Sequence, residues 1–180
     1  YAEGGPDYTV DFSQEKEEVW TSVHREISQF TRLKGNLFLE EGSLHLSCAD
    51  FGEAYTGGYD WTDYRAEFWL TCSAGRQHYG CIRVQGGVRG YFAGFSGEEF
   101  VLVKNTRQGL KKLAGIPFSW EAGKEYRVEI AAEGNKITAR TGEARIGAVD
   151  GDGPYLTGSA GIAVRDGSHV SCSKIKISGT

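Results

Sequence analysis

The stretch YRAEFWLT, residues 64–71, alternates apolar and polar residues without a break. In an extended chain successive side chains point to opposite faces, so this alternation is typical of a strand with one buried and one solvated face. We therefore predict a strand here. Its predicted core residues are Tyr64, Ala66, Phe68 and Leu70, and its predicted outward residues are Arg65, Glu67, Trp69 and Thr71.

The same alternation recurs at 126–131 and 174–177, and each such segment is bounded by Gly, Asn, Asp or Ser. Twenty-six glycines against three prolines, with 12% aromatic residues, favour short strands joined by tight turns. Turns are predicted at Gly86-Gly87, Ser96-Gly97, Gly134-Asn135, Asp150-Gly151 and Asp166-Gly167. Their spacing predicts an all-β fold, a two-sheet antiparallel β-sandwich.

The N-terminal third is less regular. Trp20, Val23, Ile27 and Phe30 recur at helical spacing after a candidate cap at Ser13, which predicts one short N-terminal helix. The segments 36–40 and 43–48 that follow have strand patterns.

Length and charge limit the class of protein. A chain of 180 residues favours a single domain, 1–180, and the missing methionine suggests a piece of a larger multidomain protein. A net charge of −4 argues against nucleic acid as a partner, since phosphate binding needs a basic surface. No apolar run is long enough to predict a membrane span. A secreted or cell-surface location is favoured, with the cytoplasm as the alternative.

The four cysteines show no CxxC spacing, which argues against a zinc site. We interpret them as small buried apolar residues or free thiols, with a disulfide framework as the alternative. They are Cys48, Cys72, Cys81 and Cys172.

The stretch CIRVQGGVRGYF, residues 81–92, predicts a β-hairpin. If Ile82, Val84 and Phe92 face the core, the connection must be the three residues 86–88. Gln85 then lies opposite Arg89, and Arg83 lies opposite Tyr91. The next turn pairs Phe92 with Val103 and Tyr91 with Lys104. The residues predicted to share the outer face are Arg83, Gln85, Arg89, Tyr91 and Lys104.

Trp69 and Glu67 border the same surface if the strand at 64–71 belongs to the same sheet. Aromatic rings cover the C–H face of a sugar, and Arg, Gln and Glu side chains match vicinal hydroxyls or a carboxylate. Such a cluster supplies roughly 5.5 kcal/mol of favourable binding free energy before the cost of association, which corresponds to a dissociation constant near 0.1 mM or weaker. The alternative is that the cationic stems only cover the sheet, with Arg83 stacked on Tyr91.

The stretch TGGYDWTDY, residues 56–64, has two interpretations: a sugar-binding loop with Tyr59 and Trp61, or a turn that leads into a core strand. No cofactor is predicted. Two alternatives invoke structural calcium: one at Asp150 and Asp152, where a polar turn is the simpler interpretation, and one built from four acidic residues. Those four are Asp50, Glu53, Asp60 and Asp63.

No catalytic motif is present. The sequence contains neither G-x-S-x-G nor H-E-x-x-H, the four histidines are scattered, and Glu67 has no obvious acidic partner on its face. We therefore predict a protein that is not an enzyme, with a glycoside hydrolase as the alternative.

The chain resembles the concanavalin A-like jelly-roll modules that accompany bacterial carbohydrate-active enzymes. The likeness spans about residues 43–178 and is carried by segments that are mainly scaffold: Gly42-Ser43-Leu44, 60–64, 126–130, 134–137, 161–165 and 173–177. It is similar to levan-binding modules, to the keto-disaccharide-hydrolase-like sandwich and to the C-terminal domain of some bacterial ADP-ribosylglycohydrolase-family proteins. The resemblance implies an accessory carbohydrate-binding domain of a larger enzyme.

The sequence thus predicts a non-catalytic module that binds a carbohydrate and tethers an associated enzyme to it. The cationic cluster favours an acidic or phosphorylated glycan. The predicted partners are this carbohydrate and the catalytic domain of the parent protein. The alternatives are a structural or protein-interaction accessory domain and, third, a glycan-active hydrolase.

Overall fold

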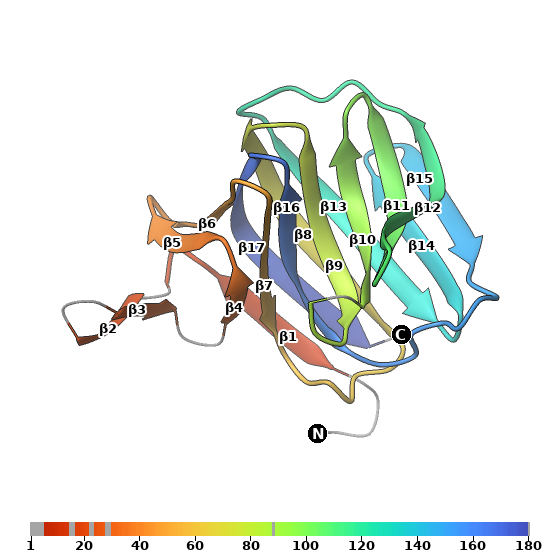
Figure 1. The fold of residues 1–180 in the computed structure, drawn as a ribbon, viewed down its shortest axis with the longest axis horizontal. Helices are drawn as coiled ribbons and strands as arrows, with labels where there is room; N and C mark the ends of the chain where they lie inside the picture. Colours follow the sequence, from red (N-terminus) through yellow and green to blue (C-terminus); the bar gives the residue numbers. More distant parts are fainter. Residues whose placement is uncertain (1–5, 15–16, 22–23, 28–29, 88, 180) are drawn as a thin grey trace.

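A computed structural model describes residues 6–14, 17–21, 24–27, 30–87 and 89–179. For residues 17–21 and 24–27 it describes the backbone alone. Within the described residues two large antiparallel sheets lie face to face, and a separate hairpin projects beside them (Figure 1). The hairpin pairs β2 (Glu17–Thr21) with β3 (His24–Ile27).

The eight-stranded sheet has the order β15-β14-β13-β8-β17-β6-β5, and β1 also pairs with β17. Its strands are β1 (Asp7–Asp11), β5 (Asn36–Glu40), β6 (Ser43–Ser47), β8 (Tyr64–Ala74), β13 (Glu125–Glu133), β14 (Lys136–Thr141), β15 (Ala144–Val149) and β17 (His169–Gly179).

The seven-stranded sheet has the order β12-β11-β10-β9-β16-β7-β4. Its strands are β4 (Thr31–Lys34), β7 (Phe51–Thr56), β9 (Gln77–Val84), β10 (Gly90–Ser96), β11 (Glu99–Thr106), β12 (Gly109–Pro117) and β16 (Ser159–Arg165).

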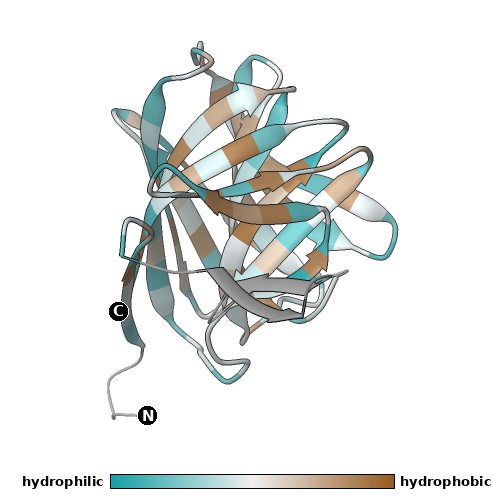
Figure 2. Cartoon of the chain, turned by 90° about the vertical axis from the view of Figure 1, so that its left-hand side faces the viewer, coloured by the Kyte–Doolittle hydropathy of each residue, from teal (hydrophilic) through white to brown (hydrophobic). Residues whose placement is uncertain are grey.

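The prediction of an all-β antiparallel sandwich is confirmed. The predicted core residues Tyr64, Ala66, Phe68 and Leu70 are fully buried between the sheets. Glycine permits close contact between the sheets, since a Cβ at Gly80 would lie 2.4 Å from the Phe68 ring. Each of the five predicted turns lies between two strands or begins at the end of one. Hydrophobic and hydrophilic residues alternate in bands along many of the strands (Figure 2).

The predicted N-terminal helix is wrong. Part of that segment forms the β2–β3 hairpin, in which Glu17 pairs with Ile27 and Glu18 with Glu26. The run Val19-Trp20-Thr21 consists of β-branched and aromatic residues, which favour strands over helices. Val23 lies outside the described residues. Phe30 is buried, and its ring centroid lies 5.5 Å from that of Phe12.

The register predicted for β10 and β11 is confirmed, but the predicted faces are wrong. Tyr91 pairs with Lys104, and Phe92 pairs with Val103. Phe92 and Val103 nevertheless point away from the sandwich core, where they join a second apolar cluster on the outer face of the seven-stranded sheet. Tyr91 belongs to the core. Because this sheet is apolar on both faces, alternation alone identifies the two faces but not which one is internal.

A β-bulge at Arg83 explains the other error in the hairpin. The main-chain amide of Gln85 donates to the Arg89 carbonyl at 3.0 Å, as the three-residue connection requires. Further along, however, Tyr91 pairs with Ile82 instead of Arg83. Arg83 adopts φ +50°, a left-handed conformation that is uncommon outside glycine. The bulge turns the Arg83 side chain inward, where it is fully buried.

The prediction that Trp69 and Glu67 border the hairpin surface is also wrong. Their strand, β8, lies at the centre of the eight-stranded sheet, whereas the hairpin belongs to the other sheet. The connection after Ala74 passes from one sheet to the other, so parity along β8 gives no information about the hairpin's outer face. Trp69 lies between Arg127 and Lys174, each 5.2 Å from its ring centroid, and Arg127 pairs with Glu67 at 2.6 Å.

The four cysteines are free thiols; Cys72, Cys81 and Cys172 are buried and Cys48 is partly buried. This agrees with their interpretation as small apolar residues. Over the described residues, no helix has the length and apolar character needed to cross a membrane.

Candidate functional site

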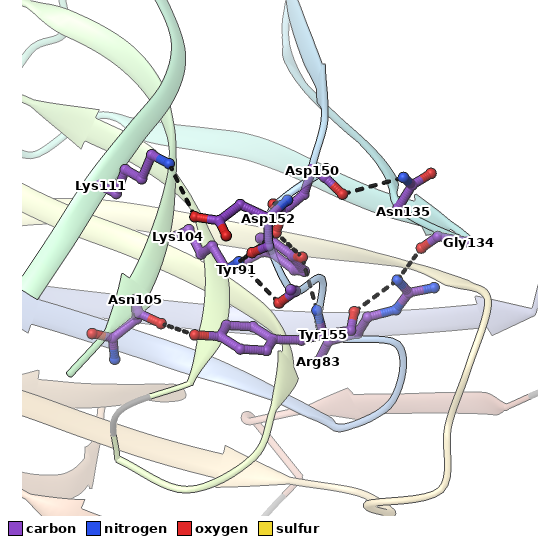
Figure 3. Close-up of polar contacts among 11 residues, drawn as sticks. Arg83, Tyr91, Lys104, Asn105, Lys111, Gly134, Asn135, Asp150, Asp152 and Tyr155 are labelled. Atoms are coloured by element: carbon purple, nitrogen blue, oxygen red, sulfur yellow. Dashed lines mark hydrogen bonds and ion pairs between the residues drawn. The ribbon is translucent and has the colours of Figure 1, made fainter. Parts of the chain in front are cut away.

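Arg83 fixes three loops at one end of the sandwich. Its Nε donates to the Thr62 carbonyl at 3.1 Å, and its Nη2 pairs with Asp63 at 2.9 Å. Its Nη1 donates to the carbonyls of Gly134 and, at 3.0 Å, Tyr155 (Figure 3). These partners occupy the guanidinium on all sides. Arg83 therefore acts as a clamp behind the loops, and its predicted position on an exposed binding face is wrong.

Tyr91 and Lys104 hold the loop from 150 to 155 through one carboxylate. Asp150 Oδ2 accepts a hydrogen bond from the Tyr91 hydroxyl at 2.6 Å and lies 2.7 Å from Lys104 Nζ (Figure 3). Burial acts to raise the pKa of Asp150, but the hydrogen bonds from Lys104 and Tyr91 outweigh it together and keep the pKa below its usual value. Asp150 is thus ionised and fully engaged.

The loop main chain completes this network. Lys104 Nζ donates to the carbonyls of Asp152 at 2.6 Å and Gly153 at 3.1 Å, and the amide of Tyr155 donates to the Tyr91 hydroxyl at 3.0 Å. Burial first, and then the hydrogen bond to Asp150, raises the pKa of Tyr91. Tyr91 and Lys104 thereby place Tyr155 at the surface in a fixed position.

An open cavity of about 420 Å³, which we call the end pocket, lies at this end of the sandwich. It lies where the β9–β10, β11–β12 and β15–β16 connections meet. Its lining residues are Gln85, Arg89, Lys104, Thr106, Arg107, Gln108, Asp152, Gly153, Pro154 and Tyr155. Three of the sequence-predicted site residues, Gln85, Arg89 and Lys104, are therefore brought together.

Charge in the end pocket is unbalanced toward the cationic side. Arg89 and Arg107 are exposed and form no ion pair within the part of the chain that the structure describes. Asp152 lies 3.9 Å from Lys111, a loose contact at the rim. The Tyr155 ring lies beneath Lys104, with Nζ 4.7 Å from its centroid, and its hydroxyl donates to the Asn105 carbonyl.

The end pocket can therefore offer an anionic ligand two free guanidinium groups beside a fixed aromatic ring. Gln85 forms part of the wall of the end pocket, where its side-chain amide donates to the Thr157 carbonyl at 2.7 Å. Planar donors next to a ring suit a hydroxylated ligand with a carboxylate or phosphate group.

The remaining sequence-predicted residues lie elsewhere. Tyr59 is 68% exposed on the loop before β8, and Trp61 is buried in the core, 5.7 Å from the Tyr64 ring. Gly57 leaves room for Trp61, because a Cβ there would lie 2.3 Å from the indole. The structural interpretation of this loop is confirmed for Trp61. Trp69 and Glu67 lie on the outer face of the eight-stranded sheet.

Except for Asp60, the acidic residues considered for calcium have separate cationic partners. Asp50 pairs with Lys34, Asp63 with Arg83, and Glu53 with Arg165 at 2.5 Å. Asp150 is held by Lys104. Among the described residues no three His, Cys, Asp or Glu side chains converge in a way that could hold a metal. The prediction that no cofactor is bound stays a prediction.

A second polar cluster lies on the outer face of the seven-stranded sheet. Glu53 is fully buried there, and it accepts a hydrogen bond from Tyr55 and pairs with Arg165. Burial, followed by neighbouring Cys81 and Glu53, raises the pKa of Tyr55, so its hydroxyl stays protonated. With both charges paired and the carboxylate inaccessible, this cluster has no free group for a ligand.

Sequence reasoning missed Tyr155, Arg107 and Gln108. Tyr155 directly follows the DGDGP turn, and an aromatic residue in such a loop, away from alternating strand positions, was the available signal. Arg107 and Gln108 form the tip of the β11–β12 turn. Nothing in the sequence places that tip beside residue 155, because the convergence depends on sheet order.

The chain matches no protein-family model, and no curated protein is significantly similar to it in sequence. Solved structures do match. The carbohydrate-binding module CBM66 from Bacillus subtilis superposes with a TM-score of 0.70 at 17% identity, over 81% of this chain and 94% of that one. A prokaryotic β-1,3-1,4-glucanase (lichenase) from a mouse hindgut metagenome superposes at 0.69 with 10% identity, over 97% and 99%.

The exoplasmic/lumenal domain of VIP36, in a Ca²⁺/Man3GlcNAc-bound form, superposes at 0.61 with 12% identity, over 84% of each chain. At these identities the likeness establishes the fold: a galectin-like, concanavalin A-like jelly roll. Binding modules and hydrolases both occur among these structures, and fold alone does not separate them. The finer resemblances, to keto-disaccharide hydrolases and ADP-ribosylglycohydrolase-family proteins, stay predictions.

Proposed function

We propose that this protein is a non-catalytic carbohydrate-binding module whose end pocket takes a saccharide with a carboxylate or phosphate group. The observation that carries the proposal is that Arg89 and Arg107, which form no ion pair with any described residue, lie beside the fixed ring of Tyr155. The fold supports the class of ligand, since CBM66 is described as a carbohydrate-binding module. In this role the module would tether an associated catalytic domain to its substrate.

The expected affinity is modest. One ring face of about 100 Å² contributes at most roughly 2.5 kcal/mol at about 25 cal/mol per Å², because Lys104 and Tyr91 already pack against the Tyr155 ring. Two charge-assisted hydrogen bonds add roughly 3–4 kcal/mol before the cost of association is subtracted. These contributions sum to about 5.5 kcal/mol before that cost, so we expect a dissociation constant near 0.1 mM or weaker. Binding of this strength suits a module that acts by raising local concentration.

Engagement of the pocket's acidic residues favours binding over hydrolysis. A glycosidase needs two carboxylates that reach a glycosidic bond. Behind the end pocket the buried Asp150 is committed to Lys104 and Tyr91, and Asp152 lies at the exposed rim of the pocket. The pKa of Asp150 is lowered, whereas a general acid requires a raised one.

The test is titration calorimetry against acidic oligosaccharides, such as oligogalacturonate and a phosphorylated mannose oligomer, alongside neutral oligosaccharides. We expect saturable binding of an acidic ligand, and Arg107→Ala should weaken it about tenfold or more through loss of one charge-assisted bond. Arg76→Ala is the matched control, since Arg76 is an exposed arginine on the turn after β8, at the other end of the sandwich.

Absence of binding to every oligosaccharide, or equal loss in the Arg107 and Arg76 variants, would contradict the proposal. Release of reducing sugar from any of them would instead support the hydrolase alternative. Retention of the melting temperature in each variant confirms that a loss of affinity arises in the pocket.

A further inference from the structure

The outer face of the eight-stranded sheet carries a groove across β13, β14 and β15. Its floor is a row of small residues, because Gly147 pairs with Thr138 and Thr138 pairs with Ala131. Two cavities, of about 390 Å³ and 190 Å³, share Thr138 as a lining residue. A Cβ at Gly147 would lie 3.2 Å from the Ile137 carbonyl and 3.3 Å from Thr138 Cγ2, so a side chain there would occupy the floor. We call this the transverse groove.

Long charged side chains form both walls of the transverse groove. The register places Lys136 opposite Glu133 on one side of the floor. On the other side it places Arg145 directly opposite Arg140, and Arg140 opposite Glu129. These residues point outward because the alternate residues of the same strands are turned toward the core.

The opposed arginines are the unusual feature. Like charges directly opposite each other on antiparallel strands repel. Arg140 is neutralised by Glu129, with Nη2 2.7 Å from Oε2. Arg145 is exposed and makes no ion pair or hydrogen bond in the described part of the chain. An anion between the two guanidinium groups would relieve the repulsion and fill the donor positions that Arg145 leaves open.

Acidic side chains along the same row do not supply that anion. Glu67 lies opposite Glu129 on β8, and Arg127 pairs with its Oε1 at 2.6 Å. Its Oε2 is buried without a hydrogen-bond partner. Two acidic and four basic side chains are gathered here, because Lys176 on β17 also lies opposite Glu67. The two ion pairs leave Arg145 as the excess charge beside the larger cavity.

We propose that the transverse groove is a second saccharide site, which holds an anionic group of an acidic glycan between Arg140 and Arg145. Thr138 and Glu129 lie beside that position and offer a hydroxyl and a carboxylate to sugar hydroxyl groups. The class of ligand, an acidic saccharide, rests on the proposed function, whereas the location does not. The segment from Arg145 to Tyr155 supplies residues to both sites.

The experiment is an amide-resolved NMR titration of the whole protein with trigalacturonate, with a sulfated disaccharide and with inorganic sulfate, in parallel. We expect the saccharides to shift the amides of Thr138 and Gly147 in a saturable way. Arg145→Ala should weaken this response about tenfold or more, and Arg145→Lys should weaken it less, because it keeps the charge but loses the planar fork. Gly147→Ala should weaken it by filling the floor.

Arg107→Ala separates this proposal from the end pocket. That variant should weaken the response of the Gln108 and Gly153 amides and leave that of the Thr138 and Gly147 amides in place, and Arg145→Ala should do the reverse. If only the Gln108 and Gly153 amides fail to shift when saccharide is added, the proposed function is contradicted. If only the Thr138 and Gly147 amides fail to shift, the proposal of a saccharide site in the transverse groove is overturned. A response at the groove to inorganic sulfate but to neither saccharide also overturns it, as does an Arg145→Ala response equal to that of the unaltered protein.

Discussion

At the residue scale, Arg83 combines a strained backbone with a buried clamp. Its guanidinium holds Thr62, Asp63, Gly134 and Tyr155 together, and its φ is +50°. We predict that Arg83→Ala lowers the free energy of unfolding by roughly 2–4 kcal/mol, because three carbonyls and a carboxylate lose a shared donor. Urea denaturation monitored by tryptophan fluorescence measures this change.

The left-handed backbone of Arg83 allows a second test, which compares the stability of the glycine and alanine variants. Alanine in a strand is normally more stable than glycine, but at φ +50° the order should reverse, so Arg83→Gly should be about 0.5–1 kcal/mol more stable than Arg83→Ala. Arg89→Ala, on the exposed side of the same hairpin, is the control and should change stability by less than about 0.5 kcal/mol. A glycine variant less stable than the alanine variant would rule out strain at this position.

Residue types alone predicted what these side chains are suited to bind, but not where they lie. Polar residues at 83, 91 and 104 were identified as a cluster, and the structure does gather them at one end of the sandwich, below the surface. Their hydrogen bonds go to main-chain groups and to Asp150. A sequence does not show whether a cation faces a ligand or a carbonyl of a distant loop, because that depends on which loops converge.

At the element scale, β6 and β17 bring two histidines into contact. His45 Nδ1 lies 2.9 Å from His169 Nε2, and Phe38 stacks on His45 with centroids 4.8 Å apart. Burial first, and then His45, lowers the pKa of His169, with Glu40 opposing the shift. Burial also lowers the pKa of the fully buried His78, with its hydrogen bond to the Ala74 carbonyl opposing the shift. These groups favour the neutral state in the folded protein.

The sign of the pH effect follows from these lowered pKa values. Below the ordinary histidine pKa of about 6.5 the unfolded chain takes up protons that the folded chain does not. Stability should therefore be highest above about pH 7 and fall as the pH is lowered toward 5, by at most about 1.4 kcal/mol per pH unit for each histidine. Urea denaturation from pH 5 to 8 measures the slope. His78→Gln and His169→Gln should each flatten it, and unchanged slopes would show that these histidines do not carry the effect.

Elements were the part of the fold most accessible from sequence. Alternation located the strands, and glycine with Asn, Asp or Ser located the turns, because both signals are local. The face of β10 and β11 was not accessible, since Phe92 and Val103 pack on an outer apolar cluster as Tyr91 packs on the core. The allocation of β8 and β9 to opposite sheets was not accessible either, because pairing partners are distant in sequence.

At the scale of the whole molecule, the N-terminal segment adds a strand to the eight-stranded sheet and two side chains to the core. The resemblance noted in the sequence covers about residues 43–178, yet β1 pairs along β17 from Asp7 with Ser178 to Asp11 with Lys174. Val10 and Phe12 are buried in the main core, and the Phe12 amide donates to the Ser173 carbonyl at 3.1 Å. The single-domain prediction therefore has a direct test.

We predict that a chain starting at residue 13 loses much of its stability. Burial of Val10 and Phe12 contributes about 1.5–3 kcal/mol each, a large share of the roughly 5–15 kcal/mol typical of a whole domain. Loss of β1 also exposes part of β17 as an unpaired edge, which favours association between chains. Thermal unfolding should show a markedly lower midpoint, and size-exclusion chromatography should show oligomers. In the intact chain Val10→Ala with Phe12→Ala should reproduce the stability loss without the association, whereas Thr9→Ala, on the exposed face of β1, should reproduce neither. A shortened chain that melts like the intact one would mean that the sandwich core is complete without this segment.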